Sequence, residues 1–179
     1  MKPSPLLVAT ALACSDAPPT GTFVGNPSLS ARIADNLVQQ VTSGRLEALE
    51  IHVTECEAPP TPLGPRVLEF DGPASTETLP LPVGDHCGLF VVVDLFTVAF
   101  EDDGTPITIV ADDFDLEVPA AFAATQGEAF VLRLGDEAWL AEVAALAPSG
   151  ETQLPRGPSA LGDAFFGGLV QGSTVLSFE

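Results

Sequence analysis

The sequence predicts a mainly β protein, an antiparallel β-sandwich of about seven to eight strands with two short peripheral helices near the C-terminus. Three observations favour this fold class. Short runs alternate apolar and polar residues, turn-forming Gly, Pro and Asp residues separate these runs, and a helical period occurs only in two late segments. With 179 residues, the chain is long enough for one domain with a substantial core.

The first two predicted strands, residues 28–34 and 45–56, lie on either side of a turn predicted at the T-S-G stretch 42–44. The first strand alternates polar residues with Leu29, Ala31 and Ile33. In the second strand the apolar residues change face, from Leu46 and Ala48 to Leu49, Ile51 and Val53. Because neighbouring residues of a strand point to opposite faces, this change predicts a bulge or register shift near Ala48.

The middle of the chain contains the strongest strand signal. A proline-rich loop at 57–65 and a short strand at 66–70 precede residues 87–100, which read CGLFVVVDLFTVAF. This density of β-branched and aromatic residues predicts either a central strand covered on both faces or two strands divided at Asp94. The Asp-Gly pair within 101–106 then predicts a hairpin.

The remaining predicted elements are three strands and two helices. The strands are residues 107–119, 129–134 and 173–178; the helices are residues 136–146 and 159–172, joined by the loop 148–158. The first helix places Trp139, Leu140, Val143 and Leu146 on one stripe, so it is expected to pack on the sheet. Trp139 is therefore interpreted as a core residue rather than a ligand platform, and Gly172 as the C-cap of the second helix.

The first thirteen residues are typical of an export signal. Lys2 gives a positive start, residues 6–13 form an apolar run, and Ala11-Leu12-Ala13 is a cleavage site of the small-x-small type. The run is too short to span a bilayer, because eight helical residues cover only about 12 Å. We therefore expect a signal peptide at 1–13, with Cys14 as the first residue after cleavage.

Residues 2–16 resemble the signal of a bacterial lipoprotein, in which a small residue precedes a cysteine that becomes acylated. The position three residues before Cys14 is Ala11, where this family usually has Leu, Val or Ile, and Ala-x-Ala also suits the ordinary signal peptidase. The resemblance implies a lipid on Cys14. Ser15 follows Cys14 as in lipoproteins sorted to the outer membrane, so the expected location is the outer membrane or cell surface, and otherwise the periplasm.

The expected domain organisation after the signal is a tether and one folded domain. Residues 14–27 are rich in Pro, Gly, Ser and Thr and predict a flexible tether, and residues 28–179 form the predicted domain. The net charge is −19, with 25 acidic residues against 6 basic ones. Such a surface repels phosphate backbones, which excludes nucleic acid as a partner. The membrane is reached through the lipid on Cys14, and an envelope protein or polysaccharide is a further candidate partner.

Cysteine and histidine positions leave a disulfide, a metal site or free thiols as alternatives. Once Cys14 is set aside, Cys56 and Cys87 form an even pair, and an exported protein favours a disulfide between them. The two histidines, His52 and His86, lie close to these cysteines in sequence and could complete a zinc or copper site. Strand geometry argues against the metal, because His86 and Cys87 point to opposite faces.

Acidic residues around the predicted hairpin suggest a calcium site as a second hypothesis. The candidate ligands are Asp102, Asp103, Asp113, Asp115 and Glu117. Alternating acids on a strand also form an ordinary solvated face, and no calcium-loop motif of the D-x-[DN]-x-[DN]-G type occurs. We therefore predict no resident cofactor and treat these residues as candidates only.

Residues 79–104 are similar to transthyretin-like β-sandwich domains of exported bacterial lipoproteins, in which a Leu-Pro-x-Gly turn leads into a long strand and a hairpin. The resemblance implies a sandwich of about seven strands and assigns no functional residues. No serine-hydrolase elbow, zinc-protease helix motif, phosphate loop or dinucleotide fingerprint occurs. The sequence thus predicts a non-catalytic envelope protein with a structural or binding role; the alternatives are a metal-binding periplasmic protein and, less favoured, a hydrolase.

Overall fold

The computed structural model describes residues 25–177, which form mainly β structure with two short helices. The strands are β1 (Ser28–Ile33), β2 (Gln39–Glu55), β3 (Thr61–Pro62), β4 (Arg66–Asp71), β5 (Ala74–Pro80), β6 (Gly84–Asp102), β7 (Thr105–Ala124), β8 (Ala129–Leu134), β9 (Gly150–Gln153) and β10 (Thr174–Ser177). The helices are α1 (Trp139–Ala144) and α2 (Ala160–Gly172).

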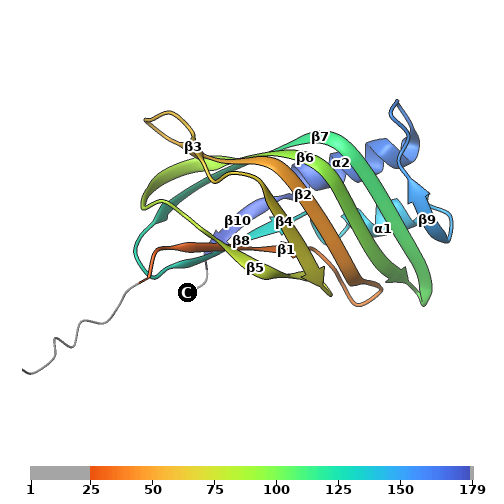
Figure 1. Cartoon of the computed structure of the whole chain (residues 1–179). Coiled ribbons are helices and arrows are strands. Elements are labelled where there is room, and N and C mark those ends of the chain that lie inside the picture. The colour runs from red at the N-terminus through yellow and green to blue at the C-terminus, as the bar shows by residue number, and fades with distance from the viewer. Residues whose placement is uncertain (1–24, 178–179) are drawn as a thin grey trace, which may run out of the picture.

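The strands form one mixed sheet in the order β10-β8-β1-β5-β4-β2-β6-β7-β9, with β3 paired to β2. The β1–β8 and β7–β9 pairs are parallel and the others are antiparallel. Figure 1 shows this sheet curling into a half-barrel, with α2 running from the β9 end toward β10. The predicted antiparallel sandwich was therefore wrong in its architecture: one sheet bends around its own core instead of two sheets stacking.

Where the sheet bends, the three longest strands change their buried residues along one line, and β2 and β6 each carry a bulge on it. In each of these strands the buried positions switch there between even-numbered and odd-numbered residues. The buried residues before and after the switch are Leu46 and Ala48, then Ile51 and Val53, in β2; Val91 and Val93, then Phe96 and Val98, in β6; and Ile109 and Ala111, then Leu116 and Val118, in β7. The changes align, because Ala48 pairs with Val93 and Val93 pairs with Phe114. Each strand therefore keeps its apolar side on the concave face while the sheet turns.

The extra residues on this line are Leu49 in β2 and Asp94 in β6; Asp113 of β7 lies opposite Asp94 with no register shift between them. Leu49 and Asp94 are left without a partner in the β2–β6 ladder, and Leu49 is 52% exposed. The bulge predicted near Ala48 is confirmed, although Leu49 joins neither buried set. Asp94 is a bulge within one continuous strand rather than a division between two. Asp113 has a φ of 52°, in the left-handed region that a short Asp side chain tolerates.

The T-S-G stretch predicted as a turn lies inside β2 instead. Gly44 serves close packing there, because a Cβ atom at this position would lie 2.9 Å from Ile33 Cδ1 and 3.2 Å from the Thr97 carbonyl oxygen. A glycine can allow other atoms to pack close to a strand backbone, or it can form a turn, and the sequence alone does not distinguish these two roles. The strand therefore begins at Gln39, six residues before the predicted start.

Both predicted helices form, with shorter bounds, and close one end of the concave face. Trp139, Leu140 and Val143 are buried as predicted, but Leu146 is 49% exposed beyond the end of α1. Trp139 stacks on Phe96 of β6 and meets Phe165 of α2 edge-on, and its indole N–H donates to the Phe165 carbonyl oxygen at 2.9 Å. Trp139 is thus a core residue that joins both helices to the sheet.

The end of α2 differs from the prediction. The helix reaches Gly172 and its C-cap is Ser173, whose hydroxyl donates to the Leu169 carbonyl oxygen and accepts from the Gly135 N–H. Gly172 instead permits close contact, because a Cβ there would lie 2.4 Å from the Asp136 backbone nitrogen. At the other end, the Ser159 hydroxyl accepts from the Gly162 N–H as an N-cap.

Three further strands lie in segments without a predicted strand: β5, and the short β3 and β9 in the predicted loops 57–65 and 148–158. β3 and β9 are short edge segments that bury few side chains, and β5 buries only Leu79, so these sequences carry little periodicity. Residues 79–104 do contain a turn, a long strand and a hairpin, as their resemblance implied. They belong to the curled sheet rather than to a sandwich.

Candidate functional site

The disulfide predicted from the cysteine count is present at one end of the sheet. Cys56 follows β2 and Cys87 lies near the start of β6; their S–S distance is 2.04 Å and their Cα atoms are 5.0 Å apart. The Cys56 N–H also donates to the Asp85 carbonyl oxygen at 3.3 Å. Both cysteines are exposed, so the bond lies on the surface rather than in the core.

The two histidines lie on opposite sides of the sheet and form no common site. The His52 Nε2 atom is 2.9 Å from Glu50 Oε2 on the exposed face. His86 is buried, with its Nε2 atom 3.0 Å from the Pro82 carbonyl oxygen. Phe122 packs against the His86 ring at a centroid distance of 5.0 Å. The structure therefore separates the two histidine side chains. His86 is buried whereas Cys87 is exposed, so these two neighbours also point to opposite faces, as strand geometry predicted.

The five calcium candidates are spread along β6 and β7. Asp102 and Asp103 lie at the hairpin, where Asp102 pairs with Thr105, whereas Asp113, Asp115 and Glu117 follow along β7. At about 3.4 Å per residue, Asp113 lies roughly 27 Å along the strand from Thr105. Among residues 25–177, no three His, Cys, Asp or Glu side chains are arranged to hold a metal ion.

Asp113 and Asp115 instead line a groove between β7, α2 and residues 154–158, with a volume of about 560 Å³. The Arg156 guanidinium donates to Asp112 Oδ2 at 3.2 Å and to Asp113 Oδ2 at 2.8 Å. The hydrogen bond to Asp112 and the charges of Asp112 and Asp113 raise the pKa of Arg156 above its ordinary value. One positive charge of the chain itself thus partly compensates Asp112 and Asp113.

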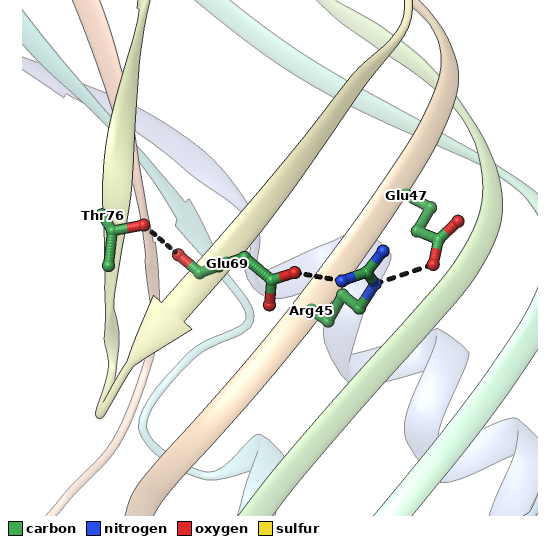
Figure 2. Close-up of polar contacts among 4 residues, drawn as sticks. All are labelled: Arg45, Glu47, Glu69 and Thr76. Carbon is green, nitrogen blue, oxygen red and sulfur yellow. Dashed lines mark hydrogen bonds and ion pairs between the residues drawn. The ribbon is translucent and has the colours of Figure 1, made fainter.

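Arg45, on the exposed face of β2, forms a comparable ion-pair network (Figure 2). Its guanidinium donates to Glu47 Oε1 at 2.7 Å and also to Glu69 on β4. The hydrogen bond to Glu47, together with the charges of Glu69 and Glu47, raises the pKa of Arg45. The Thr76 hydroxyl of β5 donates to the Glu69 carbonyl oxygen at 3.3 Å, which extends the network over three strands.

No motif in the sequence singles out an arginine, yet the structure gives several of them distinct environments. Arg45 and Arg156 each contact two carboxylates, whereas Arg32 and Arg133 are cross-strand partners in the parallel β1–β8 pair. The signal that the sequence does carry is scarcity: 6 basic residues stand against 25 acidic ones, which makes each arginine a candidate for a specific role.

The predicted signal peptide 1–13 and residues 14–24 of the predicted tether, Cys14 among them, lie outside the described residues. Within residues 25–177, the structure contains no helix with the length and apolar character needed to cross a membrane. Comparison of the chain with protein-family models, with curated proteins and with solved structures gives no match.

Proposed function

We propose that this chain is an exported, lipid-anchored, non-catalytic protein of the cell envelope that serves as a binding or structural module. Its location would be the outer membrane or cell surface, or the periplasm if the signal is removed without acylation. Cys14 would hold the lipid, and residues 15–27 would separate the anchor from the folded sheet.

The observation that supports this proposal best is the exposed Cys56–Cys87 disulfide. Cytosolic thiol reductants keep accessible cysteines reduced, whereas disulfides persist after export. The same pair was expected from the leader and from an even cysteine count once Cys14 is set aside. Two independent features, an export-type leader and a surface disulfide, therefore favour the same compartment.

The positions of the histidines support a role without catalysis by these side chains. His86 is 1% exposed and is held against the Pro82 carbonyl oxygen, so a substrate cannot reach its ring without local opening. His52 contacts Glu50 but lies on the opposite face from His86. A nucleophile–histidine–carboxylate arrangement requires a histidine within hydrogen-bond reach of both partners.

The proposal is tested by the intact mass of the protein isolated from membranes of its native host, without reductant. Expected is a chain that begins at Cys14, carries acyl chains, and weighs two hydrogens less than the form with Cys56 and Cys87 as free thiols. The matched control is Cys14→Ala, which keeps residues 15–179 but cannot be acylated. We expect this variant in the soluble envelope fraction, with the disulfide intact.

Two results would separate the parts of the proposal. A chain that begins at Cys14 without acyl mass would retain export and reject the anchor. Recovery from the cytosol of the full 179-residue chain with free thiols would reject export itself.

A further inference from the structure

Arg32 and Arg133 form a pair of like charges on the convex face of the sheet. They are direct Cα partners in the parallel pairing of β1 and β8. The next residues, Ile33 and Leu134, are also partners and are fully buried on the concave face. Because side chains alternate along a strand, the two arginines extend from the opposite face, side by side.

This arrangement is costly without a counter-charge, because like charges directly opposite one another destabilise a sheet. Arg32 contacts one carboxylate, Asp35 Oδ1 at 3.3 Å. No carboxylate of residues 25–177 lies within 4.0 Å of the Arg133 side-chain nitrogens. The Arg133 Nε atom is also buried and donates no hydrogen bond within this part of the chain, an uncommon state for a charged group. Among residues 25–177, Arg133 therefore has no ion-pair partner.

A hollow of about 450 Å³ lies beside this pair and is lined by both arginines, Ser30, Ser75, Val131 and Leu176, among others. The Ser30 and Ser75 hydroxyls already donate to the Phe130 and Glu77 carbonyl oxygens. The guanidinium groups are therefore the available charged donors of the hollow. Leu176 is 44% exposed and, with Val131, adds apolar surface next to the two charges.

We propose that Arg32 and Arg133 bind an oxyanion, the phosphate or carboxylate group of a ligand whose apolar part lies on Val131 and Leu176. A guanidinium offers donors spaced to match two oxygens of such a group, and one anion between two arginines relieves their mutual repulsion. The net charge of −19 lowers the local anion concentration, but at physiological salt it is screened over about 8 Å, so contact with the arginines decides binding.

This inference rests on the binding role proposed above and supplies its ligand chemistry, but it requires neither export nor acylation. Failure of an anion titration and failure of the intact-mass measurement are therefore distinguishable.

The test is an NMR titration of the 179-residue chain with phosphate, acetate and octanoate, each at constant ionic strength set by chloride. We expect saturable shifts of the amides of β1, β8 and β10 with at least one of the three anions. Arg133→Gln should weaken this binding by about tenfold or more, as expected for loss of a charge-assisted partner. Arg66→Gln is the matched control: it changes the net charge equally, on β4, and should leave the affinity within about twofold.

The three anions distinguish the source of the oxyanion. Preference for phosphate assigns a phosphate-bearing ligand, and octanoate binding more tightly than acetate assigns an amphiphilic carboxylate on Val131 and Leu176. If Arg133→Gln does not fold, Arg32→Gln provides the same comparison. Absence of saturable binding by any of the anions, or equal weakening by Arg66→Gln and the variant of the pair, would reject the site.

A melting experiment gives an independent readout. In chloride alone at low ionic strength, Arg133→Gln should melt at or above the wild-type temperature, because one member of the like-charge pair is removed. The anion that binds should raise the Tm of the wild type more than that of Arg133→Gln, since a ligand stabilises only the form that binds it. An equal rise in both proteins would contradict binding at this pair.

Discussion

Replacing Gly168 by alanine tests how tightly Trp139 is held between the helices and the sheet. A Cβ atom on Gly168 would lie 2.4 Å from Trp139 Cδ1 and 3.0 Å from Cγ. Ordinary carbon–carbon contacts are about 3.5–4.0 Å, so the overlap exceeds about 1 Å. The indole cannot easily move away, because it contacts Phe96 and Phe165 and a Cβ atom on Gly135 would lie 2.1 Å from its Cε3 atom.

The expected magnitude is the difference of two opposing effects. Overpacking a filled core costs about 3 kcal/mol at the upper end of its usual range, and alanine gains about 1 kcal/mol over glycine within a helix. Gly168→Ala should therefore lower the free energy of unfolding by about 2 kcal/mol. Gly167→Ala is the matched control in the same helix: its Cβ meets nothing within 4 Å, so only the helical gain remains.

Thermal and urea unfolding of both variants give the comparison, followed by circular dichroism and by the fluorescence of Trp139, the only tryptophan. For a chain of this size, Gly168→Ala should lower the Tm by about 4–8 °C and Gly167→Ala should raise it by about 2–4 °C. A Gly168→Ala protein as stable as Gly167→Ala would refute the tight contact at Trp139.

Two further predictions concern the disulfide and the β6–β7 hairpin. Cys56→Ser and Cys87→Ser should each lower the free energy of unfolding by about 3–4 kcal/mol, because the bond closes a sequence separation of 31 residues. Urea unfolding with and without reductant checks this, and a wild type that reductant leaves unchanged would contradict it. Gly104→Ala should cost about 1–2 kcal/mol, since Gly104 has a φ of 74° and open space around its Cα atom. Gly157→Ala, also in open space but without a positive φ, is the control, and equal melting temperatures would reject the backbone explanation.

Much of the local structure could be predicted from the sequence. Alternation indicated the buried face of β1, and the change of face at Ala48 indicated a bulge that the structure contains at Leu49. The cysteine count indicated the Cys56–Cys87 pair, and the helical stripe placed Trp139 in the core. These features depend on residues close in sequence or on counting, so neighbouring residues suffice to reveal them.

The architecture and the arginine pair could not be predicted in this way. An antiparallel sandwich and a curled mixed sheet need the same alternating strands; what separates them is that the changes of buried face in β2, β6 and β7 align across the ladder. Similarly, nothing in the sequence near Arg32 indicates a residue 101 positions away as its neighbour.

By itself, the sequence indicated both helices and most of the longer strands, the apolar faces of β1 and α1, and the pairing of Cys56 with Cys87. The tertiary structure alone decided that the sheet bends into a half-barrel and that Arg32 lies beside Arg133. The physical reason is that periodicity and turn chemistry act between residues near in sequence, whereas strand pairing and register depend on the packing of the whole core.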